Sequence, residues 1–174
     1  MAIEPDNKNW TWVLERQCPD CAFDAASVVP RDIGMTIRDI SSQWEVILLH
    51  PGAINRPVEN VWSPSEYGCH VRDVFRLFDF RLELMLTEDD PMFPNWDQDE
   101  TAISDRYDLQ DPLVVRRELA IAGDLLAERF DAVTAGEWLR TSLRSDGTRF
   151  TVDSIGRYLL HDPIHHLWDV SRTY

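Results

Sequence analysis

The sequence Ser63-Pro64-Ser65-Glu66-Tyr67-Gly68-Cys69-His70-Val71-Arg72-Asp73 carries the clearest helix start in this chain of 174 residues. Ser63 suits the N-cap position, Pro64 suits the first helical position, and Glu66 stands where it completes a capping box. Trp62 and Tyr67 flank this cap at the spacing of a hydrophobic staple. We predict a helix over 64 to about 86, whose apolar stripe consists of Tyr67, Val71, Val74, Phe75, Phe78, Leu82 and Met85.

Helical periodicity also predicts three other long helices. One covers about 32–49 and is stopped by Pro51-Gly52, another covers about 112–135, and the last covers about 153–170. Four long helices predict an all-α fold, a four-helix bundle.

Two features interrupt this helical pattern. Residues 138–143 and 148–152 predict two short strands joined by a turn at Ser145-Asp146-Gly147, which gives a small β-hairpin before the last helix. The acidic segment 87–111 is long for a connection inside a bundle, so it predicts a crossover loop. Its Trp, Phe and Met residues favour an ordered loop packed on the body of the protein.

Composition excludes several function classes. The formal net charge of −14 argues against binding to nucleic acid or to an anionic membrane. No apolar run approaches the roughly 18 to 20 residues that span a membrane, and residues 1–9 are polar without a signal-peptide core. An odd number of cysteines, Cys18, Cys21 and Cys69, argues against a disulfide framework. We expect a cytoplasmic protein with one domain over 1–174, in which residues 1–30 form an N-terminal extension that carries Cys-x-x-Cys.

Three histidines fall on the inward stripes of two predicted helices. His70 follows Tyr67 by three residues, and His161 and His165 lie one helical turn apart in the last helix. Neutral imidazoles that converge inside a bundle would form a metal site with an open position, which suits metal-assisted chemistry. We therefore predict His70, His161 and His165 as metal ligands, with core histidines as the alternative. Pro163 could instead begin a new helix, which would make His166 a ligand candidate.

Other side chains are candidates for supporting roles. Asp73, Asp169 and Glu66 stand where a carboxylate could hold the distal N–H of a ligand imidazole. Arg72 and Arg76 lie one turn apart and could bind the carboxylate of a substrate or a thiol cofactor, or could pair with local acids.

Two further segments have open interpretations. Trp96-Asp97-Gln98-Asp99 could cover the metal pocket, or it could be an acidic surface loop anchored by Trp96. Cys18-Pro19-Asp20-Cys21 has the spacing of a metal knuckle, but a structural zinc site needs two more ligands and the chain has no second Cys-x-x-Cys. We favour a tight turn with two partly buried thiols there, and we expect Cys69 in the core.

The chain resembles the DinB-like superfamily of bacterial four-helix-bundle metalloproteins, which includes mycothiol- and bacillithiol-dependent transferases. The resemblance rests on the segment 62–73 and on His161-Asp162-Pro163-Ile164-His165-His166-Leu167-Trp168-Asp169-Val170. It is similar to the actinobacterial branch that also carries Cys18-Pro19-Asp20-Cys21-Ala22-Phe23-Asp24. The resemblance implies zinc or nickel on His70, His161 and His165, frequent homodimers, and transfer or isomerisation with a low-molecular-weight thiol such as mycothiol.

Three hypotheses follow for the function. The first is a metal-dependent enzyme, which performs thiol transfer or isomerisation and, as a second choice, metal-assisted hydrolysis of a small molecule. The second is a metal-binding, stress-related or sensing protein without turnover. The third is a bundle whose histidines belong to the core. An enzyme should show a pocket with polar groups that converge on an open metal position.

Overall fold

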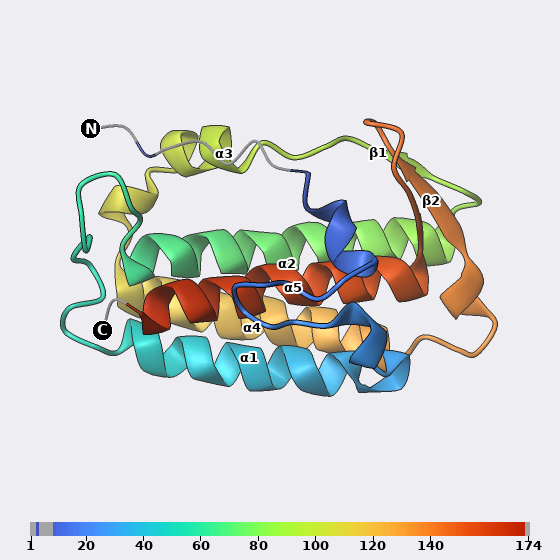
Figure 1. The fold of residues 1–174 in the computed structure, drawn as a ribbon, viewed down its shortest axis with the longest axis horizontal. Helices are drawn as coiled ribbons and strands as arrows, with labels where there is room; N and C mark the ends of the chain where they lie inside the picture. Colours follow the sequence, from blue (N-terminus) through green and yellow to red (C-terminus); the bar gives the residue numbers. More distant parts are fainter. Residues whose placement is uncertain (1–2, 4–8, 173–174) are drawn as a thin grey trace.

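The computed structural model describes Ile3 and residues 9–172, so most of the polar stretch 1–9 lies outside the described residues. Four long helices run side by side in Figure 1: α1 (Ile33–Leu48), α2 (Pro64–Thr87), α4 (Pro112–Asp131) and α5 (Val152–Ser171). Helix α4 packs along both α1 and α2, and α5 contacts those same two helices. The predicted four-helix bundle is confirmed. No helix in the described part of the chain is long and apolar enough to cross a membrane.

The start of α2 is the capping box that the sequence predicts. The Ser63 hydroxyl accepts a hydrogen bond from the Glu66 N–H at 3.2 Å, and the Glu66 carboxylate accepts one from the Ser63 N–H at 2.8 Å. The rings of Trp62 and Tyr67 meet edge to face with centroids 5.4 Å apart, as a hydrophobic staple requires. These contacts fix where α2 begins and therefore on which side His70 lies.

Helix α5 continues unbroken through Pro163. Proline removes one amide donor from the helix interior, but the turns on both sides remain helical. A second capping box, between Thr151 and Ser154, starts this helix at Val152. The 3.6-residue period therefore holds across the histidine segment, and no new helix begins at Pro163.

A small sheet lies at one end of the bundle (Figure 1). Strands β2 (Thr141–Arg144) and β3 (Arg149–Thr151) form the predicted hairpin, with Ser142 opposite Phe150. The crossover adds strand β1 (Met92–Phe93), which pairs with β2 in parallel. The segment that the sequence assigned to the beginning of the first strand forms a short 3-10 helix instead, Glu137–Leu139.

The crossover and the N-terminal segment cover the bundle. After β1 the chain forms α3 (Gln98–Ser104) and the 3-10 turn Tyr107–Leu109, and α3 lies against α2. The N-terminal segment forms three short 3-10 helices, Trp10–Leu14, Ala25–Ser27 and Pro30–Asp32, all of which contact α5. This arrangement places Cys18 and Cys21 against α5.

Candidate metal centre and cavity

Helix α5 presents two pairs of ligand-type side chains, and each pair spans one helical turn. His161 and His165 form one pair, while Asp162 and His166 form the other. Adjacent residues of a helix point about 100° apart, so the two pairs face different neighbours. The first pair meets the N-terminal segment, and the second meets α2.

We call the second pair together with His70 the His-Asp group. The donor atoms of His70, Asp162 and His166 all lie within 4.8 Å of one another. The Nε2 atom of His70 is 3.1 Å and 3.3 Å from the two carboxylate oxygens of Asp162. The contact is a hydrogen bond in this structure, and its length also falls in the range of roughly 3.0 to 3.4 Å that separates two ligands bound at about 2.1 Å to one metal.

Aromatic and acidic neighbours hold the His-Asp group in place. His70 is fully buried, and Trp96 stacks on its ring at a centroid distance of 5.4 Å and an angle of 11°. The Nδ1 atom of His70 is buried and has no hydrogen-bond partner among the described residues. The Nδ1 atom of His166 lies 2.9 Å from the Asp169 carboxylate, which would orient this ring with Nε2 toward Asp162.

The charges of the two pairs suit metal binding. Burial disfavours the charge of Asp162, but the neighbouring His70 and His166 outweigh it and hold the pKa of this carboxyl at about 2. Burial, helped by the nearby His165, lowers the pKa of His161 to about 4. At neutral pH, Asp162 is therefore ionised and His161 is neutral, which are the forms that bind cations.

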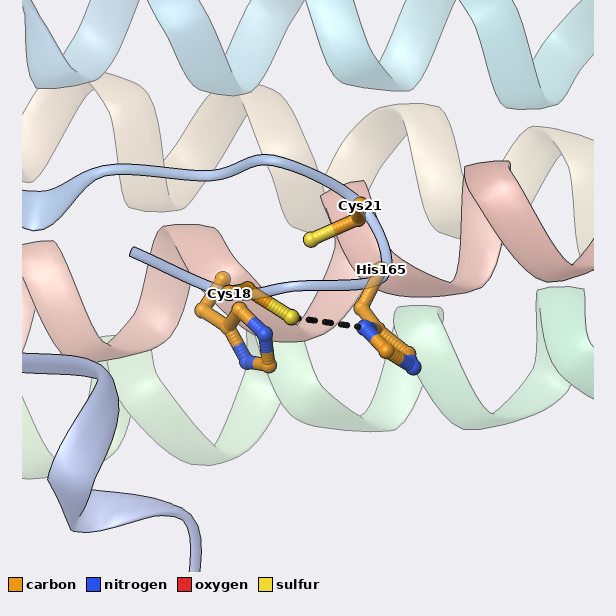
Figure 2. Close-up of side chains that lie close together, drawn as sticks. Cys18, Cys21 and His165 are labelled. Carbon is orange, nitrogen blue, oxygen red and sulfur yellow. Dashed lines mark hydrogen bonds between the residues drawn. The ribbon is translucent and has the colours of Figure 1, made fainter. Parts of the chain in front are cut away.

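The first pair belongs to what we call the Cys-His group, which consists of Cys18, Cys21, His161 and His165. Their donor atoms also lie within 4.8 Å of one another. Figure 2 shows Cys18 and Cys21 on the N-terminal segment and His165 on α5, with 3.6 Å between the Cys18 Sγ atom and the His165 Nδ1 atom. All three cysteines of the chain are free thiols.

The structure thus divides the three predicted ligands between two groups. His161 and His165 are together, as their spacing predicts, but His70 groups with Asp162 and His166. The set of His70, His161 and His165 stays a prediction that only a metal measurement can test. Asp162 and His166 have the same spacing as His161 and His165, so the sequence contains a feature from which the grouping of His70 with Asp162 and His166 could have been predicted.

A cavity of about 1480 Å³ opens beside the His-Asp group. Asp162 and His166 line it, together with Trp62, Tyr67 and Trp96. The segment 96–99 forms part of its wall, which favours the first of its two interpretations, a loop that covers the site, over an acidic surface loop. The lining also contains many ionisable side chains: His161, His165, Arg81, Arg144, Asp97, Asp99, Glu100, Asp146 and Asp169. A concave site where aromatic and polar groups converge is typical of small-molecule binding.

Arg81 is a functional candidate that the sequence analysis missed. It lines the cavity, is only 4% exposed, and its Nη2 donates to the Pro94 carbonyl at 3.0 Å. Burial, together with the nearby Arg144, lowers the pKa of Arg81 to about 10. No carboxylate among the described residues forms an ion pair with it, which is unusual for a buried cation. The feature of the sequence that could have identified Arg81 is its position three residues after Phe78, on the inward stripe of α2.

Arg72 and Arg76 lie away from the lining of the cavity. Arg72 forms ion pairs with Asp73 at 2.9 Å and Glu118 at 2.9 Å, and Arg76 pairs with the same two acids. Pairing with local acids, the alternative that the sequence allowed, is therefore present. Their predicted cofactor-binding role remains untested.

Two of the three predicted supporting acids have other partners. Asp73 also accepts a hydrogen bond from the Tyr107 hydroxyl at 2.6 Å, and Glu66 pairs with Arg56. Cys69 is fully buried, as expected for a core thiol.

Comparison with known proteins agrees with this architecture. The family model of the DinB superfamily matches residues 24–170. The structure is similar to that of YfiT from Bacillus subtilis, described as a probable metal-dependent hydrolase with an unusual four-helix bundle topology. The TM-score is 0.72 at 16% sequence identity, and the match covers 84% of this chain and 89% of YfiT. At this identity the likeness shows the fold. No curated protein matches the sequence.

Proposed function

Since the chain belongs to the DinB superfamily, we propose that it is a metal-dependent enzyme whose divalent metal is held by His70, Asp162 and His166. The observation that carries this proposal is the convergence of these three donors beside a cavity of about 1480 Å³. Two nitrogen ligands and one oxygen ligand leave coordination positions for a substrate. A divalent metal there supplies Lewis acidity, which polarises a substrate oxygen and lowers the pKa of water or of a thiol.

The surrounding side chains would position the substrate and exclude water. Trp62 and Trp96 enclose the buried ring of His70, and Asp169 orients His166. Arg81, which has no carboxylate partner in the described part of the chain, and Arg144 both line the same cavity, so we propose an anionic small molecule as the substrate class. This local charge operates within a protein whose net charge is −14.

Thiol transfer or isomerisation is the reaction class that we place first. A cavity of about 1480 Å³ exceeds the roughly 300 to 1,000 Å³ of an ordinary single-ligand site. That volume leaves room for a thiol cofactor beside an acceptor molecule. Metal-assisted hydrolysis is the second candidate, and the likeness to YfiT, described as a probable metal-dependent hydrolase, favours it.

A metal-binding protein without turnover is the alternative from a different class. Such a protein should have a filled coordination sphere and no adjoining cavity. The three-donor group, with two of its members on a cavity wall, favours the enzyme.

The test compares the wild type, His166→Ala and the control His50→Ala, in which an exposed histidine outside the group is removed. Each protein is loaded with zinc or nickel and assayed with thiols plus electrophilic acceptors, and separately with esters and amides. We expect turnover that chelation abolishes and that only His166→Ala loses. Asp169→Asn should lower metal affinity or activity by about 10- to 100-fold.

Two results would overturn the proposal. Turnover that survives in His166→Ala would place the reaction elsewhere in the protein. Absence of metal-dependent turnover in both panels, with metal bound, would favour the non-catalytic alternative.

A further inference from the structure

The Cys-His group has no part in the proposed reaction, although four ligand-type side chains converge there. Its two cysteines lie before residues 24–170, the part of the chain that the family model matches. We propose that Cys18, Cys21, His161 and His165 form a closed, four-ligand zinc site that fastens the N-terminal segment to α5.

The donor set is the first argument for zinc. Two thiolates and two imidazoles are a common ligand set of structural zinc sites, which are tetrahedral and closed to substrates. With Zn–S near 2.3 Å and Zn–N near 2.0 to 2.1 Å, tetrahedral geometry separates the sulfur and nitrogen by about 3.6 Å. The Cys18 Sγ atom lies 3.6 Å from the Nδ1 atom of His165.

Burial gives an independent second argument. Cys18 is 1% exposed and His161 is 4% exposed. The Nε2 atom of His161 is buried and has no hydrogen-bond partner among the described residues. A buried polar atom without a partner calls for a ligand or an ion, and a metal on the lone pair would satisfy this nitrogen.

The backbone of the N-terminal segment is shaped to bring its two thiols together. The Cys18 N–H donates to the Phe23 carbonyl at 2.8 Å, and the Ala22 N–H donates to the Cys18 carbonyl at 3.0 Å. Ala22 adopts a left-handed conformation with φ of 59°, which is uncommon for a residue with a Cβ atom. This tight turn places both cysteines opposite a pair of histidines one helical turn apart, as Figure 2 shows for His165.

The proposed zinc site would also shape the cavity. Trp10 packs on the rings of His161 and His165, with centroid distances of 5.2 Å to each. Trp10 is at the same time part of the cavity wall. Fastening Cys18 and Cys21 to α5 therefore holds Trp10 in place beside His161 and His165, which also line the cavity.

The experiment uses the full chain, purified in reducing buffer without chelator, and measures zinc released by a thiol-modifying mercurial. The variant is Cys21→Ser, because Cys21 is only partly buried, and the matched control is Cys69→Ala, which removes a thiol outside the group. We expect release of about one zinc per chain from the wild type and the control, and none from Cys21→Ser. Cobalt substitution should give sulfur-to-metal charge-transfer absorption that only Cys21→Ser lacks.

Limited trypsin digestion gives a readout that does not depend on counting metal. Arg16 is exposed and lies just before Cys18, and its guanidinium sits over the Trp12 ring at 4.6 Å. Cleavage after Arg16 should be faster in Cys21→Ser than in Cys69→Ala. The proposal is overturned if the wild type holds no mercurial-releasable zinc after reconstitution, or if Cys21→Ser retains the zinc and the cobalt absorption.

Discussion

Replacing Arg81 by methionine should leave the ligand-free protein about as stable as the wild type and yet weaken its affinity for anions. Arg81 is a buried guanidinium that lines the cavity, and among the described residues it contacts one carbonyl and two aromatic rings rather than a carboxylate. A buried cation without an ion-pair partner is costly unless an anionic ligand compensates it. The prediction therefore separates a ligand-binding arginine from a structural one.

The magnitude follows from the environment of the guanidinium. The pKa of Arg81 falls from 12.5 to about 10, which corresponds to about 3 kcal/mol of lost stabilisation of the charged form. Methionine removes this cost, but it also removes the charge-assisted hydrogen bond to Pro94, which contributes about 1.5 to 3 kcal/mol. A thioether keeps contact with the rings of Phe78 and Phe93. The net change in the free energy of unfolding should be within about 1 kcal/mol of zero.

The affinity for an anion, unlike the stability of the ligand-free protein, should change strongly in Arg81→Met. Loss of charge-assisted hydrogen bonds worth about 1.5 to 3 kcal/mol weakens binding by about 10- to 150-fold. The assay is urea denaturation with and without inorganic phosphate, and Arg144→Met is the matched control. Arg144 is buried like Arg81 and lines the same cavity, but it pairs with Asp146 at 2.7 Å, so this variant is a control for stability alone and should be destabilised without phosphate.

Two outcomes would refute the reasoning about Arg81. Destabilisation of ligand-free Arg81→Met by more than about 3 kcal/mol would mean that the charge is compensated within the fold. Equal stabilisation of the wild type and Arg81→Met by phosphate would mean that the anion binds elsewhere.

Two further predictions concern packing and pH. Gly156→Ala should destabilise the bundle by about 1 to 3 kcal/mol, because the new Cβ atom would lie 2.7 Å from Ile33 and 3.0 Å from Phe130. Urea denaturation measures this change, and an unchanged midpoint would refute the close packing around Gly156. Burial disfavours the charge of Glu66, but Arg56 outweighs it and holds the pKa of this carboxyl below 4.5. The stability that Glu66 contributes is therefore complete above its ordinary pKa and is lost as the pH falls through the folded value. As the pH falls below the ordinary pKa of a glutamate, the unfolding free energy of Glu66→Gln should fall less steeply than that of the wild type, and equal slopes would contradict the assignment.

The fold was predictable because its signals are local. The cap at Ser63, the apolar stripe of α2 and the turn at 145–147 each act over one or two helical turns or a single hairpin. Strand β1 was not predictable in the same way, because Met92 and Phe93 become a strand only by pairing with residues 143 and 144, far along the chain.

The candidate site was predictable only in part, because it depends on which helix face meets which neighbour. Periodicity placed His161 and His165 on one stripe, and the structure keeps them together. It could not show that this stripe faces the N-terminal segment while Asp162 and His166 face α2. The Cys-x-x-Cys motif has no second copy in the chain to complete a zinc site, but His161-x-x-x-His165 offers the same number of ligands.

The most direct test of the metal-dependent account is the metal-to-protein ratio, measured by elemental mass spectrometry on the wild type, His70→Ala, His165→Ala and His166→Ala. The account predicts that His70→Ala and His166→Ala each lose one metal, that combining them removes no further metal, and that both retain the metal lost in His165→Ala. The account is contradicted if His70→Ala and His165→Ala lose the same single metal while His166→Ala keeps it. That result would show that His70 and His165 share one metal, as the three-histidine set of His70, His161 and His165 requires.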